Sequence, residues 1–299
     1  MVRGVVYSVL ASSLFGLMYY YTSLLHPLSS EQIFGWRMLL TVPIMGLMIV
    51  LLGETRQLQD LLHRLRREPV LWLTLPTSSA LLGLQLWLFM WAPSHGKALE
   101  VSLGYFMLPL ALIAMGKLVY GERLSSFQKL AAACAAIGVV HELLRVGGFS
   151  WASLAVCMGY PFYFYLRRRM KTDQLAGLWS DMLLTLPLAF YFVFWGESGQ
   201  HLKVQFELRP MLFVLVIGLG VISSAALVSY ILASRRVPFS LFGLLGYVEP
   251  VLLVFVSLLL GERIGASEWL TYIPIWLAVG VLMLEGLVSV RRPVAPPLV

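Results

Sequence analysis

The chain has 299 residues, of which 59% are hydrophobic and only 12% are charged, and its formal net charge is +7 at pH 7. An ordinary soluble domain carries about 25% charged residues, so a soluble fold of this size would lack the polar side chains to cover its surface. The composition excludes a soluble protein and indicates an integral membrane protein.

Ten segments are long and apolar enough to cross a bilayer, which takes about 20 residues each. The first is too long for the hydrophobic part of a signal peptide, and no convincing cleavage site follows it, so we interpret it as a membrane helix. Breaks at charged residues or at glycine and proline clusters separate the others. The predicted spans are 4–25, 32–52, 70–92, 100–119, 126–144, 149–166, 176–195, 210–231, 238–260 and 268–288.

The connection between the second and third spans carries an amphipathic pattern. Leu58, Leu61, Leu62 and Leu65 recur at helical spacing, with basic residues between them. A short helix on the membrane surface is one interpretation. A loop whose arginines set the topology is the other, and we favour the loop.

The lysines and arginines predict the orientation of the chain, because cytoplasmic loops are enriched in them. With the N-terminus inside, most of the 22 basic residues fall in predicted cytoplasmic segments. Both termini are therefore expected in the cytoplasm, and residues 291–299 are expected to form a disordered tail. Topology accounts for the net charge, so no nucleic-acid partner is needed to explain it.

The sequence contains an internal repeat. Gly-Glu-Arg occurs at 121–123 and again at 261–263, and each copy follows an apolar segment with a proline, Pro109 or Pro250. Ten spans divide into five and five, and because five is odd the second half must enter the membrane in the opposite orientation. We predict two five-helix repeats of inverted topology, 1–144 and 145–290, with the two prolines as hinge candidates.

Three ionisable residues within predicted spans are singled out as candidates: Arg37, Asp181 and Glu249. Each costs about 2.5–3.5 kcal/mol at the middle of a span, so each must face protein or water. Glu249 is predicted near the bilayer centre, beside Pro250. It is a candidate for binding a cationic group or carrying a proton, and the alternative is a hydrogen bond to a neighbouring broken helix.

The other polar candidates have structural alternatives as well. Arg37 could receive an anionic or carbonyl group, or it could pair with Glu31 or Glu100, and we favour the structural pair. Asp181 is shallow enough to reach water, which favours a structural role. Gln85 needs a polar partner inside the membrane and is a candidate for lining a pathway.

Aromatic residues make up 13% of the chain. Those at 19–21 and 160–165 lie toward predicted span ends, where interfacial belts are expected. Tyr163 and Trp87 are candidates for pointing inward instead, toward a cavity suited to flat or cationic solutes. We add Tyr105, from the repeated Gly-Tyr pair, to the residues expected to line or gate such a cavity.

Several kinds of chemistry lack support in the sequence. There is no Walker loop for ATP, and no His-Glu-x-x-His motif or other paired metal set. Cys134 and Cys157 lie in apolar runs, which favours buried thiols over disulfides or zinc ligands. No metal or cofactor is therefore expected. An intramembrane enzyme would need several catalytic groups at one depth, and the three buried charges are expected at three depths.

Several motifs together resemble a known family. The segment from Trp91 to Pro109, with Leu99-Glu100-Val101-Ser102-Leu103-Gly104-Tyr105-Phe106 inside it, is similar to the third-to-fourth span signature of RarD-type proteins, in the EamA branch of the drug/metabolite transporter superfamily. The resemblance covers essentially the whole chain. Further matches are Gly177-Leu178 with Asp181 and Pro187, Arg236-Val237-Pro238-Phe239-Ser240, and Tyr272-Ile273-Pro274-Ile275-Trp276.

The resemblance implies ten helices in two EamA repeats, a bacterial inner-membrane location and a permease for small organic solutes. It places Arg37 at the family's second-span arginine, Gln85 where asparagine is usual, and Asp181 at an acidic position. The chain departs from the family pattern at three positions. Trp36 replaces an expected histidine, Ser23 stands where the first span often carries a lysine, and Glu249 stands where many members have a small residue.

These observations lead to one functional hypothesis. The chain is expected to move an amino acid, metabolite or antibiotic-like solute across the bilayer by alternating access, with protons as a further candidate partner. The expected pathway residues are Arg37, Gln85, Trp87, Tyr105, Tyr163, Asp181 and Glu249. The alternative is a non-transporting membrane enzyme or assembly factor.

Overall fold

The computed structural model describes residues 2–94, 98–148, 150–195, 206–249, 251–252, 255, 265 and 267–291. Within these residues the chain forms helices and turns and no strand. The helices are α1 (Val2–Ser23), α2 (Ser30–Leu51), α3 (Thr55–Arg67), α4 (Leu71–Ser94), α5 (Ala98–Tyr120), α6 (Ser126–Val146), α7 (Trp151–Arg169), α8 (Leu175–Phe190) with the π-helix η1 (Tyr191–Trp195), α10 (Met211–Ser234), α11 (Phe239–Leu245) and α13 (Trp269–Arg291).

The described helices confirm an all-α integral membrane fold. Seven of them are long and apolar enough to cross a membrane, and a shorter apolar stretch runs from Trp269 to Glu285. Their bounds follow the predicted spans closely. The largest differences are at the ends of α7, α10 and α13, each of which continues three residues past its predicted end, to Arg169, Ser234 and Arg291. Much of the predicted ninth span, 238–260, lies outside the described residues after α11.

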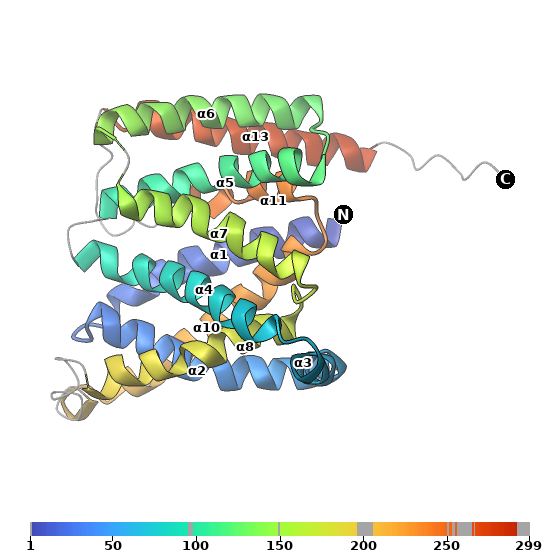
Figure 1. Cartoon of the computed structure of the whole chain (residues 1–299). Helices are drawn as coiled ribbons and strands as arrows, with labels where there is room; N and C mark the ends of the chain where they lie inside the picture. The colour runs from blue at the N-terminus through green and yellow to red at the C-terminus, as the bar shows by residue number, and fades with distance from the viewer. Residues whose placement is uncertain are drawn as a thin grey trace.

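The helices stack in two layers, as Figure 1 shows. One layer holds α6, α5, α7, α4 and α8, and the other holds α13, α11, α1, α10 and α2. The strongest contacts between the layers are at their edges, where α6 packs on α13, α5 packs on α11, and α2 packs on α8. Within the layers, α10 packs on α1 and on α2, and α7 packs on α5 and α4. This arrangement leaves room for a cavity between the layers.

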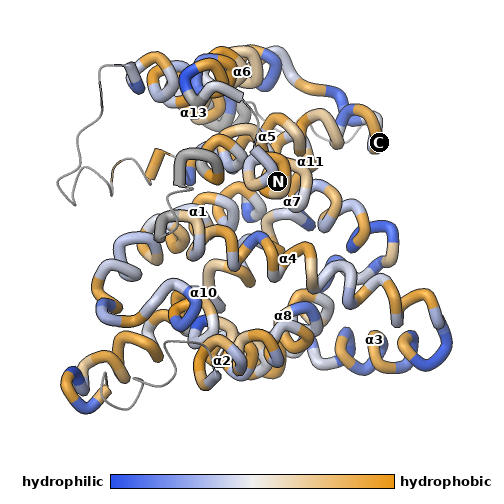
Figure 2. Tube along the Cα trace, turned by 60° about the vertical axis from the view of Figure 1, so that its left-hand side comes forward, coloured by the Kyte–Doolittle hydropathy of each residue, from blue (hydrophilic) through white to orange (hydrophobic). Residues whose placement is uncertain are grey.

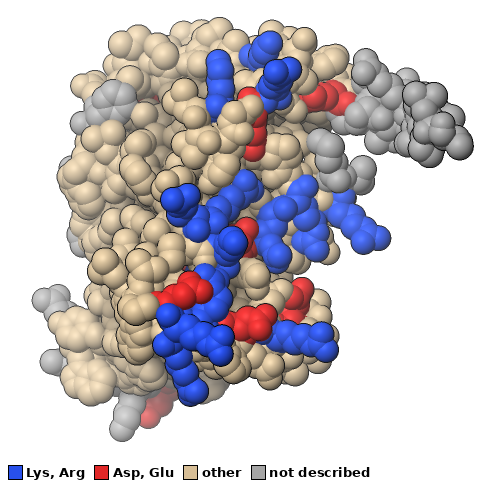
Figure 3. Space-filling model, turned by 45° about the vertical axis from the view of Figure 1, so that its right-hand side comes forward, with Lys and Arg blue, Asp and Glu red and all other residues tan. Residues whose placement is uncertain are grey.

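The bundle has two chemically different ends. The N-terminus, α3 and the end of α13 lie at one end, here called the α3 end (Figure 1). Hydrophobic residues run along the helices, and hydrophilic ones gather near helix ends and on α3 (Figure 2). Lysines and arginines cluster on the face that contains the α3 end (Figure 3). This pattern is typical of a bundle that crosses the bilayer along its helix axes.

The connection that we expected to be a loop is a helix. Residues Thr55–Arg67 form α3, which packs on α4 and α8 at the α3 end. Leu61 is buried, and Leu58 and Leu65 pack beside it against Leu71 and other apolar residues. The interpretation of this segment as only a topology-setting loop was therefore wrong. Its leucine spacing creates an apolar face, and burial of that face stabilises the helix.

Arg64 fixes the end of α3 to the neighbouring helices. Its Nη2 and Nη1 groups donate to the carbonyl oxygens of Met170 (2.9 Å) and Lys171 (3.1 Å), which follow α7. Its Nε donates to the Glu68 carboxylate at 2.8 Å. This hydrogen-bonded guanidinium holds the pKa of Glu68 below its usual range, because it favours the charged carboxylate.

Glycine allows α11 to approach α5 closely. A Cβ on Gly243 would lie 2.7 Å from the Pro109 carbonyl oxygen and 2.9 Å from the Leu112 Cβ. Small residues permit such backbone contacts between membrane helices, where lipid competes with larger apolar side chains. Pro109 itself lies inside α5, which continues on both sides of it. The contact between Gly243 and Pro109 therefore closes one edge of the bundle.

We predict that Gly243→Ala destabilises the protein by about 1–3 kcal/mol, because the added methyl group overpacks against backbone atoms that cannot move aside. The measurement is thermal unfolding of the purified protein in detergent. Gly280→Ala in α13 is the matched control, since a Cβ there meets nothing within 4 Å. Equal unfolding temperatures for the two variants would contradict the close approach.

Candidate functional site

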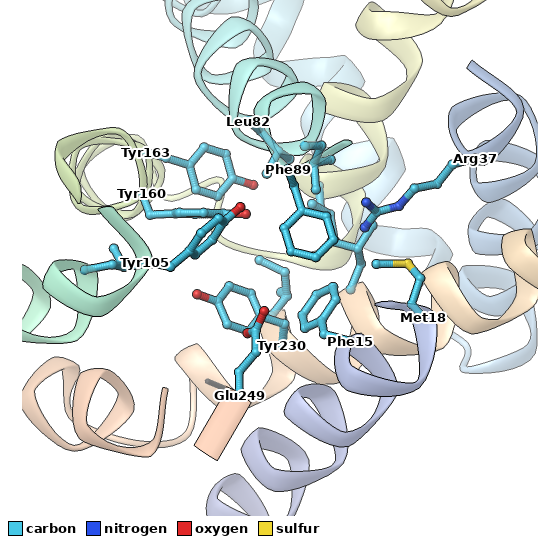
Figure 4. Close-up of a pocket in the computed structure, with 15 residues that line it drawn as sticks. Phe15, Met18, Arg37, Leu82, Phe89, Tyr105, Tyr160, Tyr163, Tyr230 and Glu249 are labelled. Carbon is cyan, nitrogen blue, oxygen red and sulfur yellow. The ribbon is translucent and has the colours of Figure 1, made fainter. Parts of the chain in front are cut away.

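A cavity lies between the two layers near the middle of the bundle (Figure 4). Its volume is ≈ 40 Å³, room for a few water molecules at about 10–15 Å³ each, so an organic solute fits only if the walls of the cavity move apart. Six described helices and the turn after α11 supply most of its polar and aromatic wall. The lining residues are Phe15, Met18, Arg37, Leu82, Leu86, Phe89, Tyr105, Leu108, Tyr160, Tyr163, Leu178, Leu227, Tyr230, Ile231 and Glu249.

Arg37 carries the positive charge of the cavity. It lies in the second turn of α2 and is 1% exposed. Its Nε donates to the Ser223 hydroxyl of α10 at 2.8 Å, while Nη1 and Nη2 are buried without a hydrogen-bond partner. Its guanidinium points toward the cavity (Figure 4). The expected pair with Glu31 is not formed, and the side chain of Glu100 is outside the described part of the chain.

Glu249 is the acidic residue of the cavity. The helix that starts at α11 tightens at Gly246 and Tyr247, where the N–H groups of Tyr247 and Glu249 donate to carbonyl oxygens three residues back. Glu249 lies directly after this turn and lines the cavity. It interacts electrostatically with Arg37, yet these two residues form no ion pair. Non-helical turns at membrane depth are typical of sites that line a cavity.

Tyrosines surround the space between these two charges. Tyr105 of α5, Tyr160 of α7 and Tyr230 of α10 all line the cavity with Glu249. Figure 4 shows the Tyr105 and Tyr160 hydroxyls on the side of Tyr163 and the Tyr230 ring beside Glu249. The Tyr230 ring packs on Phe15 with centroids 5.9 Å apart and on Phe242 with centroids 4.8 Å apart. Ring–ring packing of this kind holds the tyrosines in place and leaves their hydroxyls as the polar groups of the wall.

A second, smaller cavity of ≈ 30 Å³ adjoins the first on the side of the α3 end. Tyr105, Leu108, Tyr230 and Glu249 belong to both walls, so these side chains separate the two spaces. The rest of the second wall comes mainly from small or apolar residues. These are Ser8, Ser12, Pro109, Leu112, Phe242, Gly243 and Gly246.

A cluster of side chains closes the bundle at the α3 end. The rings of Tyr120 and Phe239 stack with centroids 5.1 Å apart. The Arg168 guanidinium lies 3.8 Å from the Phe239 ring centroid, and its Nη2 donates to the Ser234 carbonyl at 2.7 Å. These residues join α5, α7, α10 and α11. We call Tyr120, Glu122, Arg168 and Phe239 the α3-end cluster.

Glu122 of the first Gly-Glu-Arg motif belongs to this cluster. Its carboxylate accepts hydrogen bonds from the backbone N–H groups of Phe239 and Ser240, both at 2.8 Å. These N–H groups open α11 and have no partner within the helix, so the carboxylate caps it. The motif therefore ties the end of the first half to the start of a helix in the second.

Asp181 makes a buried ion pair in place of an open site. Its Oδ2 lies 3.5 Å from Nη1 of Arg167, and the two side chains are 0% and 1% exposed. Its Oδ1 accepts a hydrogen bond from the Ser78 hydroxyl at 2.6 Å, and the Tyr163 hydroxyl lies beside it. Asp181 does not itself line either cavity. This geometry agrees with the structural alternative given for it above.

The sequence-predicted pathway residues divide into two groups. Arg37, Tyr105, Tyr163 and Glu249 meet at the central cavity. Gln85 is buried and joins α4 to α7, since its Nε2 donates to the Ala155 carbonyl at 2.7 Å. The Trp87 ring stacks on Trp91, with centroids 4.9 Å apart, outside the cavity wall.

The structure describes one of the two hinge candidates, Pro109, but not the other, Pro250. Pro109 lines the second cavity, beside Gly243 and Gly246. Pro250 and the second Gly-Glu-Arg, residues 261–263, lie outside the described residues. A hinge role stays a prediction for both prolines.

Sequence reasoning missed several residues of this region. Tyr160 was assigned to an interfacial belt, Tyr230 was not singled out, and Arg167 was counted among loop arginines. Glu142, which lies within the predicted fifth span, was also overlooked; it is 3% exposed and pairs with Arg145 at 2.7 Å. Helical spacing offered one signal, because Tyr160, Tyr163 and Arg167 recur at intervals of three and four and so share a face.

Metal binding finds no support in the part of the chain that the structure describes, where no group of three or more His, Cys, Asp or Glu residues is placed to hold an ion. Cys157 is buried and Cys134 is partly buried, and both are free thiols.

Comparison with known proteins identifies the family. The model of the EamA-like transporter family matches residues 2–141. The chain is 44% identical to the chloramphenicol-sensitive protein RarD of Pseudomonas aeruginosa, over 97% of this chain and 95% of the relative. It is 38% identical to an uncharacterized transporter of Haemophilus influenzae (96% and 95% covered) and 28% identical to protein RarD of Escherichia coli (97% of each).

A solved crystal structure shares the fold, with a TM-score of 0.66 at 17% identity over 94% of this chain and 96% of its own. The chain belongs to the EamA-like transporter family and is a RarD-like member of it. It is accordingly a multi-pass membrane transporter of the bacterial inner membrane.

We predict that Asp181→Asn and Arg167→Met each lower the stability by about 3–5 kcal/mol, because either change leaves a buried charge without its partner. The double variant is expected to recover much of this loss, since no uncompensated charge remains. A double-mutant cycle of thermal unfolding measures the coupling. Simple additivity of the two losses would show that the pair does not interact.

Proposed function

We propose that this protein is a permease that moves a small organic solute across the inner membrane through the central cavity. The observation that carries the proposal is that Arg37, with two guanidinium nitrogens that have no hydrogen-bond partner, and the acidic residue Glu249 face one cavity between the two layers. Charged side chains inside a membrane are costly and typically mark the path of a substrate or ion. An enzyme of the membrane or an assembly factor offers no comparable reason to keep these two charges apart.

Two inverted repeats, 1–144 and 145–290, form the basis of alternating access in this proposal. Support comes from the helix pairs at the edges, α2 with α8, α5 with α11 and α6 with α13, since each joins the same helix of the two halves. The family model, which matches residues 2–141, covers the first half.

Two hydrogen bonds repeat the same geometry. Arg37 of α2 donates a hydrogen bond to the Ser223 hydroxyl of α10. Asp181 of α8 accepts one from the Ser78 hydroxyl of α4. The corresponding residues are spaced by 144 and 145 positions. An approximate two-fold axis that exchanges the halves would relate the two bonds, which supports the proposed repeat and gives the transporter one similar gate on each side.

The α3 end is the cytoplasmic end in this proposal, with both chain termini on that side. The concentration of lysines and arginines on the face that contains it supports this orientation (Figure 3). The α3-end cluster is then the closed cytoplasmic gate. Opening it requires the Tyr120–Phe239 stack and its Arg168 contact to separate, which connects the second cavity, and then the central one, with the cytoplasm.

The gate predicts that Phe239→Ala exposes the second cavity, because it removes the ring held between Tyr120 and Arg168. The readout is labelling of Ser12→Cys, a position in that cavity, after replacement of Cys134 and Cys157 by serine. A membrane-impermeant thiol reagent is added to inside-out vesicles. Labelling should become several-fold faster in the Phe239→Ala variant.

Phe213→Ala is the control for this experiment, since Phe213 lies on α10 with 63% of its surface exposed and away from the cluster. It should leave the labelling rate unchanged. An equal rate for Phe239→Ala and Phe213→Ala, or labelling from the outer face alone, would contradict the gate.

Protons are proposed as the coupling ion, with Glu249 as their carrier. The groups that face it are Arg37, Tyr105, Tyr160 and Tyr230. A single carboxylate can hold either a proton or a cationic group of the solute. Competition between the two would couple their movements in opposite directions.

Flux into proteoliposomes tests both transport and coupling. The probe is the solute that raises the unfolding temperature most in a screen of amino acids, their analogues and antibiotics, with chloramphenicol included because of the name of one relative. Wild-type flux should respond to an imposed pH gradient, and Glu249→Gln should lose that response. An unchanged response in this variant would exclude Glu249 as the carrier, and no flux of any solute would exclude the permease.

A further inference from the structure

We infer that a groove at the α3 end binds the headgroup of an anionic phospholipid. The groove lies between α3 and residues 169–177, which end α7 and begin α8, and we call it the α3 groove. Its volume is ≈ 670 Å³, far larger than either cavity between the layers. It is separate from the site of the proposed function, and lipid binding there does not depend on transport.

Arg64 joins the two walls of the α3 groove. On α3 its guanidinium donates to both oxygens of the Glu68 carboxylate, each at 2.8 Å. On the opposite wall it donates to the carbonyl oxygens of Met170 at 2.9 Å and Lys171 at 3.1 Å. All three of its nitrogens are used in this way, and its charge is matched by Glu68. These hydrogen bonds fix the distance between the walls, so the groove is a built space.

Three other cations line the α3 groove. Arg67, Arg169 and Lys171 are exposed, and their side chains form no hydrogen bond or ion pair in the part of the chain that the structure describes. Once Glu68 is paired with Arg64, Asp60 is the acidic residue of the lining that remains. A recess lined by an excess of one charge concentrates ions of the opposite charge. The α3 groove therefore favours an anion.

The end of α7 directs three consecutive arginines to three different places. Arg167 turns inward and pairs with Asp181. Arg168 lies over the Phe239 ring in the α3-end cluster. Arg169, by contrast, lines the α3 groove. Because the first two arginines are packed, they fix the rotation of this helix end, and Arg169 has a defined place on the groove wall.

Lys171 occupies a backbone position that usually carries glycine. α7 ends in a Schellman motif, in which the N–H groups of Lys171 and Thr172 donate to the carbonyl oxygens of Arg168 (3.1 Å) and Arg167 (2.9 Å). The φ angle of Lys171 is 52°, a left-handed conformation that is unfavourable for a residue with a side chain. Glycine would serve the turn better. What the lysine adds is an ammonium group on the wall of the groove.

The α3 groove lies at the depth of lipid headgroups. The apolar spans that follow its two walls begin at Leu71 and Leu175. Trp72 is 68% exposed, and its indole Nε1 donates to the Leu65 carbonyl of α3 at 3.0 Å. Tryptophan is enriched where a membrane meets water, so an exposed indole bonded to α3 places that helix at the membrane surface. Lysines and arginines gather on the same face of the molecule (Figure 3).

Charge and location together select an anionic phospholipid. Phosphatidylglycerol carries one net negative charge, whereas phosphatidylethanolamine carries an ammonium group as well and is neutral overall. A lipid is confined to the bilayer surface, so its phosphate reaches the groove at a higher effective concentration than a soluble phosphate does. Basic pockets between helices at the cytoplasmic side of membrane proteins bind such headgroups. The α3 end is the cytoplasmic end in the proposed orientation.

Native mass spectrometry of the purified protein tests this inference. The protein in detergent receives equal amounts of phosphatidylglycerol and phosphatidylethanolamine with the same acyl chains, and the ratio of the bound lipids is measured. The wild type should prefer phosphatidylglycerol by about fivefold or more, as expected when basic residues at a membrane surface meet an anionic headgroup. In a second arm, inorganic phosphate or glycerol phosphate is added and should leave the bound lipid in place.

A triple variant removes the three cations of the groove that have no ion pair. Arg67→Gln, Arg169→Gln and Lys171→Gly together should abolish the preference for phosphatidylglycerol. The matched control removes three exposed charges at the same end of the bundle from residues that do not line the groove, and it should keep the preference. Its substitutions are Arg66→Gln, Arg123→Gln and Arg235→Gln.

Lys171→Gly alone separates binding from folding. The preference should fall about threefold, because one of the three cations is lost. The unfolding temperature without added lipid should stay equal or rise, because glycine adopts the left-handed conformation of this turn more easily.

Three results would overturn the inference. Equal binding of the two lipids by the wild type would exclude an anionic-lipid site. The same loss of preference in both triple variants would show an effect of surface charge in general. Displacement of the lipid by soluble phosphate would assign the groove to a soluble ligand. None of these results bears on the permease, which is tested by solute flux.

Discussion

A charge inside a bilayer must be paired or hydrated, and this constraint organises the protein. Two buried carboxylates are paired: Asp181 forms an ion pair with Arg167, and Glu142 forms one with Arg145. Arg37 and Glu249 instead face a cavity. The difference between these two arrangements distinguishes the structural ion pairs from the candidate site.

The packing of the helices prevents that cavity from collapsing. At the edges, the layers meet where glycine lets backbones approach, as Gly243 does at Pro109. In the middle, the side chains between the layers are large and aromatic, and Tyr160 and Tyr230 pack on one another and on Phe164. Rings of this size fill most of the space and cannot collapse further without leaving their preferred packing. A small hollow therefore remains next to the two charges.

Much of the fold could be predicted from the sequence because bilayer thickness fixes the length of a span. The predicted bounds 126–144 and 210–231 differ by only a few residues from α6 and α10. The segment of α3 was wrongly predicted to be a loop. Its leucine spacing gives an apolar helical face, but the sequence does not show that neighbouring helices are placed to bury that face. Arg167 was misjudged because three consecutive arginines at a span end resemble a topology signal, and only packing shows that the first of them turns inward.

The site was partly predictable because ionisable side chains are costly inside a membrane. The cost of a charge inside a span pointed to Arg37, Asp181 and Glu249 in the sequence, and the same criterion should also have included Glu142. Cost does not say which of them finds a partner inside the protein. Pairing depends on the rotation of α7 and α8 about their axes, which places Arg167 against Asp181, and a hydropathy pattern does not encode that rotation.

The role of Glu122 shows how the same constraint extends from the site to the gate. The first turn of a helix has free N–H groups, and inside a membrane protein these groups also need a partner. Glu122 supplies it for α11, the helix that leads to Glu249. Any movement that pulls α5 away from α11 at the α3 end must break this cap together with the Tyr120–Phe239 stack. In the proposed permease, opening of the cytoplasmic gate would therefore release the start of α11 and so affect the position of Glu249.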